Sequence, residues 1–339
     1  MEEIIVRKIQ VTGGSTLTVS LPKEWTKNVG LKAGGYVSIM AQPDDTLLIK
    51  PGKALERKAL KRAELNVKDS SPPNLAVRQL IALYLAGYDL IEVFLNGENI
   101  KTKDMMKEIA KNKLIGMEVI DETVSTLTFQ CLVTHRELPI DRALSRMNLL
   151  TFSMCNDAVE SLTKLNKRLA SEIVARDDEV DRLYFFVVRL LKGASTNRTI
   201  LGDIGLSSPR ECLGYRMVAK SLERAADHTT RIAKATLNID NPIDHELSKL
   251  IINLKDIALT MLKNSIKLLL NRFDIGKANN LIQDLEEVEI LENEILRAML
   301  NKPLKVADLI ELRMAIESLR RIAEYSSDVT EITINLSTK

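Results

Sequence analysis

The first fifty residues mix apolar and polar positions in the manner of short β-strands. Residues 16–21 alternate with a period of two, Gly13-Gly14 before them is a turn signal, and Pro22 suits the first turn of a helix. The predicted elements are strands at 4–11, 16–21, 36–40 and 46–50, with one helical turn that begins at Pro22. A domain of residues 1–52 is too small to bury its apolar faces alone, so we expect it to form a dimer.

The pattern changes over residues 53–137, which predict a small α+β module with its helices on one face of the sheet. The expected elements are a basic helix at 53–62, helices at 75–85 and 103–112, and strands at 90–95, 117–120 and 126–133. The basic helix is either a solvated linker or a nucleic-acid contact. His135 stands apart from other metal-ligand types, so we interpret it as structural.

The remaining residues, 138–339, have the apolar spacing of long amphipathic helices. We expect two antiparallel three-helix bundles, with domain boundaries at 138–240 and 241–339. The predicted helices are 139–164, 166–192, 209–238, 244–271, 275–300 and 306–336. An octapeptide that begins at Ser221 reappears in altered form from Ser318, which indicates duplication of a three-helix unit.

Composition narrows the class of protein. Hydrophobic residues make up 45% and aromatic residues only 4%, which favours aliphatic helical cores. The net charge of +2 excludes a simple charge-driven coat for nucleic acid. Three widely spaced cysteines, no apolar stretch long enough for a bilayer and an acidic start predict a cytoplasmic protein without membrane insertion.

The N-terminal segment resembles the AbrB/SpoVT swapped-hairpin family in the order of its motifs, from Val6-Arg7-Lys8 through the glycine turn and Leu21-Pro22-Lys23 to Gly30-Leu31-Lys32-Ala33-Gly34. The resemblance implies an all-β barrel built by two interleaved chains that binds double-stranded DNA. The matching DNA-facing residues are Arg7, Lys8, Lys23 and Lys27. The turn lacks the usual arginine, and Ser15 and Thr16 stand there instead, so we expect weaker phosphate contacts.

The helical zone resembles the PhoU family of phosphate-transport regulators. Its hallmarks are the segment Leu222-Glu223-Arg224-Ala225-Ala226-Asp227-His228 on a third helix and an acidic pair on each second helix. A swapped-hairpin domain fused to PhoU repeats is a combination seen mostly in archaea. The resemblance implies a regulator of phosphate uptake that acts at DNA.

The acidic pairs of the first repeat also have a physical reading. Asp177 and Asp181 are four residues apart, as are Glu223 and Asp227, so each pair lies on one helix face. Four converging carboxylates repel one another unless a cation joins them, and an oxygen-rich site suits Mg, Mn or Fe. The resemblance implies iron or zinc, with His228 as an added nitrogen ligand. In the alternative reading, Glu223 pairs with a neighbouring Lys220 or Arg224 and the aspartates face water.

The second repeat departs from this pattern. Leu285 and Glu289 replace the two aspartates of its second helix, and Arg320 and Glu324 replace the acidic pair of its third. We predict that Arg320 pairs with Glu324 or Glu289 and supplies the positive charge that a metal would bring. This repeat is therefore expected to bind no metal there, or to bind it much more weakly.

Two functions from different classes remain open. One is a dimeric DNA-binding transcriptional regulator whose bundle senses phosphate status through a metal, ligand or partner. The other is a cytosolic adaptor of a phosphate transporter or signalling protein, with the N-terminal domain used only for dimerisation. Di-iron enzyme chemistry is excluded, because none of His135, His228 and His245 follows a Glu or Asp by three residues.

Overall fold

The computed structural model describes residues 5–41, 46–52, 60–68, 70–95, 100–134 and 137–338. The chain forms two compact units, Met1–Ala59 and Leu60–Lys339. His135 and most of the predicted basic helix at 53–62 lie outside the described residues. Each unit is considered by itself.

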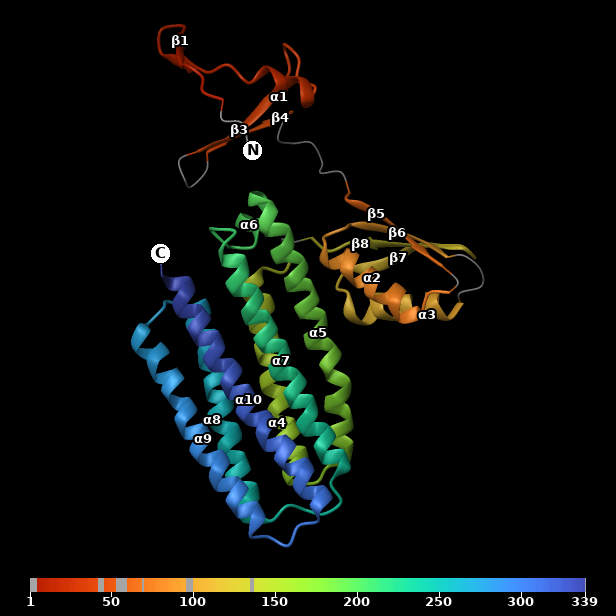
Figure 1. The fold of residues 1–339 in the computed structure, drawn as a ribbon, viewed down its shortest axis with the longest axis vertical. Helices are drawn as coiled ribbons and strands as arrows, with labels where there is room; N and C mark the ends of the chain where they lie inside the picture. The colour runs from red at the N-terminus through yellow and green to blue at the C-terminus, as the bar shows by residue number, and fades with distance from the viewer. Residues whose placement is uncertain are drawn as a thin grey trace. The chain divides into compact units, whose positions relative to one another are not determined.

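The first unit has the predicted order of strands and helix (Figure 1). It contains β1 (Gln10–Thr12), β2 (Thr16–Thr18), α1 (Lys23–Asn28), β3 (Val37–Ala41) and β4 (Leu47–Pro51). The turn between β1 and β2 places Gly13 and Gly14 at φ +64° and +89°, a backbone region that glycine enters without steric cost. Pro22 is the N-cap of α1, one position before the predicted one.

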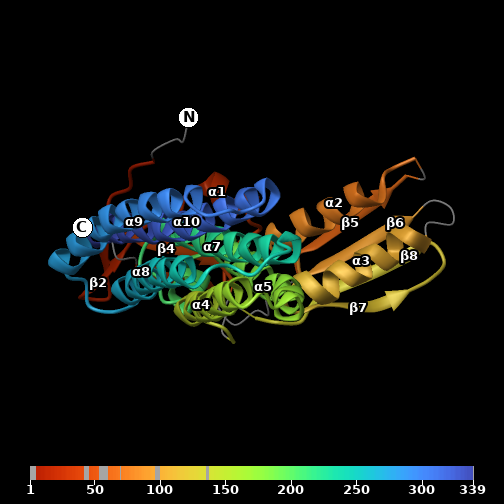
Figure 2. The same ribbon diagram turned by 90° about the horizontal axis from the view of Figure 1, so that it is seen from below.

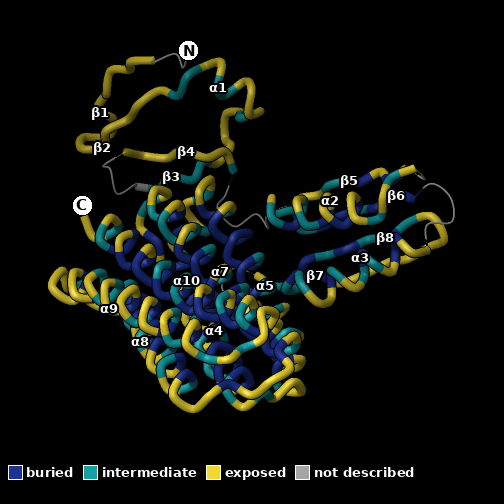
Figure 3. Tube along the Cα trace, turned by 60° about the horizontal axis from the view of Figure 1, so that its bottom comes forward, coloured by how far each residue is buried: buried dark blue, intermediate teal, exposed yellow. Residues whose placement is uncertain are grey.

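This unit has no core of its own among its described residues. None of them is buried, whereas the bundle helices have continuous buried faces (Figure 3). Apolar side chains on both strands of the first hairpin are largely exposed: Val11 and Leu17 are each 67% accessible, although they pair across the hairpin. The two hairpins are separate two-stranded sheets in this copy, so closure into a barrel with a second copy stays a prediction.

The second unit begins with an α+β module whose four-stranded sheet has the order β5-β6-β8-β7. Its elements are β5 (Arg62–Val67), α2 (Pro73–Leu85), β6 (Leu90–Leu95), α3 (Ile100–Lys113), β7 (Met117–Glu122) and β8 (Thr126–Cys131). The β5 strand corrects the sequence analysis, which ended a basic helix at Arg62. Parallel pairing with β6 buries Leu65 and Val67, and this long-range pairing places Arg62 at the start of a strand rather than at the end of a helix.

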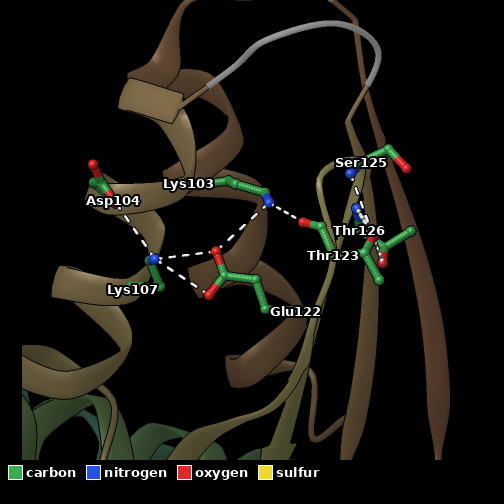
Figure 4. Close-up of polar contacts among 7 residues, drawn as sticks. All are labelled: Lys103, Asp104, Lys107, Glu122, Thr123, Ser125 and Thr126. Atoms are coloured by element: carbon green, nitrogen blue, oxygen red, sulfur yellow. Dashed lines mark hydrogen bonds and ion pairs between the residues drawn. The ribbon is translucent and has the colours of Figure 1, made fainter.

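Both helices of the module cover one face of the sheet, as predicted (Figure 1 and Figure 2). Polar contacts fasten α3 to the β7–β8 hairpin (Figure 4). The buried amine of Lys103 donates to the carbonyl of Thr123 and lies 3.6 Å from Glu122, whose carboxylate also accepts a hydrogen bond from Lys107 at 3.2 Å. These contacts hold α3 at its N-terminal half and thereby set the position of its C-terminal end.

The six predicted bundle helices are confirmed to within a few residues. They are α4 (Ile140–Thr163), α5 (Lys167–Thr196), α7 (Glu211–Asn238), α8 (His245–Leu270), α9 (Ile275–Leu300) and α10 (Val306–Ser337). A short helix that was not predicted, α6 (Arg198–Asp203), precedes α7, and its Leu201 is buried. The two three-helix sets share one continuous apolar core, because α7 and α10 pack against each other at the centre.

The module docks on α5 through a buried arginine. The guanidinium of Arg189 donates to the carbonyls of Tyr84 and Tyr88 at 2.6 and 2.8 Å and to the carboxylate of Asp89 at 2.9 Å. It also lies over the Tyr84 ring, 4.9 Å from its centroid. One side chain of the bundle therefore satisfies the C-terminal carbonyls of α2 and joins the two parts of this unit.

We expect Arg189→Gln to lower the free energy of unfolding by about 3 kcal/mol, because the substitution leaves buried carbonyls and Asp89 without their charged donor. Hydrogen exchange should rise selectively at the end of α2 and the start of β6. Lys192→Gln, at an exposed position on the same helix, is the matched control. Equal protection in the two variants would contradict the docking role of Arg189.

Candidate functional site

The four carboxylates singled out in the first repeat come together between α5 and α7. Asp177 and Asp181 lie on α5, Glu223 and Asp227 lie on α7, and these two helices pack along each other. We call these four residues the acidic quartet. Their side chains are partly withdrawn from water: Asp181 is 19% and Glu223 12% exposed.

The negative charges of the quartet act on one another's pKa values. Burial, followed by the charges of Asp181 and Asp227, raises the pKa of Asp177 to about 6. The Thr230 hydroxyl beside it counteracts part of this shift, although it forms no hydrogen bond of normal geometry. Burial also raises the pKa of Glu223 and of Asp227, and the neighbouring carboxylates add to both shifts.

A lysine from the α+β module neutralises one side of the quartet. Lys113, the last residue of α3, places its Nζ 2.8 Å from Asp181 Oδ2 and 3.0 Å from Asp178 Oδ1. Burial lowers the pKa of Lys113, but the two hydrogen bonds outweigh that effect and raise it above its usual range. No sequence signal points to Lys113, because it belongs to a different module and lies 68 residues away from Asp181 in the chain.

A second lysine forms an ion pair with Glu223. Lys220 donates to both carboxylate oxygens of Glu223 from one turn away on α7, and its amine also lies 5.1 Å from the centroid of the Tyr184 ring. The pairing of Glu223 with Lys220 was one part of the alternative reading. The alternative also expected the aspartates to face water. Asp181 does not do so, because its carboxylate is bound by Lys113.

The structure does not bring His228 to the quartet. Its ring faces α10, where Nδ1 lies 3.2 Å from Ser318 Oγ and the Tyr325 ring is 5.7 Å away, centroid to centroid. Burial, assisted by Arg231 and Arg321, lowers the pKa of His228 to about 4. One residue along a helix turns a side chain by about 100°, which places Asp227 and His228 on different faces.

The second repeat replaces the quartet with ion pairs inside the bundle. Arg320 pairs with Glu324, as predicted, but its other partner is Glu292 at 3.1 Å rather than Glu289. Glu292 is buried on α9 and also accepts from Arg313 at 3.0 Å. The sequence analysis missed Glu292, because the aligned position in the first repeat is Tyr184 and carries no charge.

The oxygen-rich quartet fits a hard cation in the chemistry of its donors. Asp177, Asp181, Glu223 and Asp227 would hold such an ion, and His228 would not. Within the described ranges, no group of three or more His, Cys, Asp or Glu side chains already has a ligating arrangement. A cation would therefore have to displace Lys113 from Asp181.

The residues expected to contact DNA all lie at the surface of the first unit. Arg7 and Lys8 precede β1, Ser15 and Thr16 lie at the turn into β2, and Lys23 and Lys27 lie on α1. Every one of these residues is exposed. Their exposure leaves them free to contact a polyanion, as the swapped-hairpin resemblance requires.

Two protein-family models match different parts of the chain. The PhoU domain model matches residues 144–236 and 251–333, which together make up just over half of the chain. The chain belongs to the PhoU family. A second family model, the antidote-toxin recognition MazE bacterial antitoxin, matches residues 10–56, so the PhoU repeats follow an N-terminal MazE/AbrB-like domain.

Relatives of the PhoU repeats are named phosphate-specific transport system accessory protein PhoU homologs. The one from Clostridium acetobutylicum is 27% identical over 203 residues, covering 58% of this chain and 89% of the relative. The one from Zymomonas mobilis is 24% identical over 193 residues, covering 56% and 79%. These names describe accessory proteins rather than enzymes, in agreement with the prediction.

Solved structures show the same fold for the repeats. The phosphate transport system regulatory protein PhoU from Streptococcus pneumoniae superposes with a TM-score of 0.51 at 19% identity, over 59% of this chain and 93% of that one. PhoU from Pseudomonas aeruginosa gives a TM-score of 0.50 at 18% identity, over 58% of this chain and 94% of that one.

Among the described residues, no helix has the length and apolar character needed to cross a membrane.

We expect His228→Ala to lower the free energy of unfolding by about 2 kcal/mol at pH 7.5, because it removes packing between the two PhoU repeats. The folded state disfavours protonation of His228, so wild-type stability falls as the pH drops from 6.5 towards 4, and the variant lacks this component. The gap between the two proteins should therefore narrow at pH 5, as measured by urea unfolding.

The exposed His245→Ala is the control for this measurement. A gap that stays constant with pH would contradict a neutral buried imidazole. A weaker affinity of His228→Ala for divalent cations would show that His228 is a ligand after all.

Proposed function

We propose that the protein is a DNA-binding transcriptional regulator of phosphate uptake, in which the PhoU bundle acts as a cation-binding sensor or a docking domain for a partner. The observation that carries this proposal is the union, in one chain, of a MazE/AbrB-like domain with two PhoU repeats. Accessory proteins that align with the repeats alone explain the link to phosphate transport. The additional domain supplies a surface for DNA.

The N-terminal unit supports the DNA-binding part of the proposal. Its apolar hairpin faces lie in water in a single copy, which is the condition that pairing with a second copy relieves. Its cations Arg7, Lys8, Lys23 and Lys27 are exposed on the first strand region and on α1. A symmetric dimer doubles this cationic surface, which compensates for the small excess of positive charge in one copy.

The contacts of the α+β module support coupling between the bundle and the N-terminal unit. The module is held to α5 by Arg189 at one point and by Lys113 at another. Lys113 binds the very carboxylate that a cation in the quartet would need. Cation binding and module docking at Lys113 therefore compete for Asp181, and the chain leads directly from this module to the N-terminal unit.

We expect Lys113→Met to raise the affinity for Mn²⁺ by about tenfold or more, because it removes the ammonium that competes for Asp181 and Asp178. Isothermal titration of chelator-stripped full-length protein measures the change. Lys111→Met, at an exposed position in the last turn of the same helix, is the matched control and should bind like the wild type.

Two outcomes would contradict the cation proposal. One is equal Mn²⁺ affinity in Lys113→Met and wild type. The other is Mn²⁺ binding that survives Asp181→Asn/Asp227→Asn in the Lys113→Met background, which would place the ion elsewhere.

A second function is favoured by the names of the relatives and by the share of this chain that they match. They are named accessory proteins of a phosphate-specific transport system, and their matches cover 58% and 56% of this chain. In that reading the protein is a cytosolic adaptor that regulates a phosphate transporter or sensor kinase, and the N-terminal unit serves only to join two copies.

DNA binding separates the two functions. We expect light scattering to show that the full chain is a dimer. We also expect the protein to retard a DNA duplex from its own upstream region in an electrophoretic mobility-shift experiment. The association constant should fall steeply between about 50 and 200 mM salt, because binding to DNA phosphates releases counterions. Arg7→Gln/Lys8→Gln should weaken binding about tenfold or more and lower the salt slope by about one for each phosphate that is no longer neutralised.

Lys32→Gln is the control, since this exposed lysine of the same unit lies outside the proposed surface. A monomer, or a dimer that forms no sequence-specific complex at low salt, would contradict the regulator. A dimer without DNA binding would favour the adaptor.

A further inference from the structure

The second PhoU repeat contains a cavity whose lining residues the proposed function does not use. It lies at the closed end of the α8–α9 hairpin and has a volume of about 510 Å³, within the usual range for small-molecule sites. Its polar lining consists of three cations and three carboxamides: Lys267, Arg272, Lys277, Asn264, Asn271 and Asn280. Cations and amide donors around one cavity are the groups that bind oxyanions.

The positive charge of this cavity is largely uncompensated. Within the described part of the chain, Lys267 and Arg272 have no carboxylate partner, and Lys277 lies 3.9 Å from Asp274 at the edge of ion-pair distance. Asp284 is the one carboxylate in the lining. Burial, and then the charge of Glu287, raises its pKa.

In the first repeat, an ion pair joins the two helices of the corresponding hairpin. When the α4–α5 and α8–α9 hairpins are aligned at their turns, Asp157 and Glu160 correspond to Asn264 and Lys267. In the first repeat Arg176 of α5 reaches Asp157 at 2.5 Å and Ser153 at 3.2 Å. The position that corresponds to Arg176 is Asp284. The charges are thus exchanged between the repeats, and the bridge that links α4 to α5 has no counterpart between α8 and α9.

We propose that this cavity binds a phosphorylated organic small molecule. The guanidinium of Arg272 and the two lysines suit a phosphoryl group with more than one negative charge. The volume is far larger than a single tetrahedral oxyanion requires. Leu268 and Leu281, both buried and with their apolar atoms in the lining, offer a surface to the organic part. The carboxamides provide partners for its hydroxyl or amide groups.

This inference is independent of the proposed function. The cavity lies in the second repeat, away from the acidic quartet on α5 and α7 and in a different unit from the DNA-facing residues. Variants in its lining should therefore leave Mn²⁺ affinity and DNA binding unchanged. Loss of DNA binding in the wild-type protein would leave the cavity proposal intact.

Isothermal titration of the full chain in chelator-containing buffer tests the proposal with three probes: ATP, inorganic phosphate and citrate. We expect ATP to bind at least tenfold more tightly than inorganic phosphate, and citrate to bind more weakly than ATP. Lys267→Ala/Arg272→Ala should weaken ATP binding about tenfold or more. Asp284→Asn should tighten it several-fold by removing a carboxylate that repels the phosphates.

Lys263→Ala is the matched control, because this exposed lysine lies one turn from Lys267 on α8 and does not line the cavity. It should bind ATP like the wild type. The proposal is overturned by absence of ATP binding, by equal affinity in Lys267→Ala/Arg272→Ala and wild type, or by inorganic phosphate or citrate binding as tightly as ATP. All substituted side chains are exposed or partly exposed, and an unchanged thermal midpoint confirms that the variants fold.

Discussion

Carboxylates that lie half-buried on two packed helices repel one another, and nearby positive charge is needed to hold them there. In the first PhoU repeat it comes from two directions. Lys220 neutralises Glu223 from within α7, and Lys113 reaches Asp181 from the α+β module. The need for charge balance on α5 thus becomes a contact between the bundle and the α+β module.

The second repeat meets the same constraint inside one bundle. Arg313 and Arg320 bind the buried Glu292, and Arg320 with Arg321 binds Glu324. Two carboxylates with three guanidiniums need no charge from outside the repeat. The second repeat is thus charge-balanced within itself, whereas the first also draws on Lys113 from the α+β module.

The N-terminal unit is governed by a different constraint. Its hairpins are well formed, but its described residues enclose no core, so its stability depends on a surface that one copy does not contain. The bundle, in contrast, has one continuous core that spans both repeats. Judged by its described residues, the N-terminal unit is therefore the least independently stable part of the molecule.

Local patterns in the sequence determined most of the architecture. The helical period predicted all six long bundle helices, and alternation with glycine and proline signals predicted the hairpin around Gly13-Gly14 and, to within one residue, the start of α1. These elements are set by interactions between residues a few positions apart, which the sequence displays directly. The same local spacing places Asp177 with Asp181 on one face of α5 and Glu223 with Asp227 on one face of α7.

Contacts between distant segments were decided only by the tertiary structure. Strand β5 forms because β6 lies beside it, and His228 turns to Ser318 because α10 packs there. Lys113 and Asp181 are separated by 68 residues, so no periodicity connects them. The sequence by itself determined which faces carry charge and which are apolar; folding decided which charges meet, because that depends on the packing of whole helices rather than on neighbours along the chain.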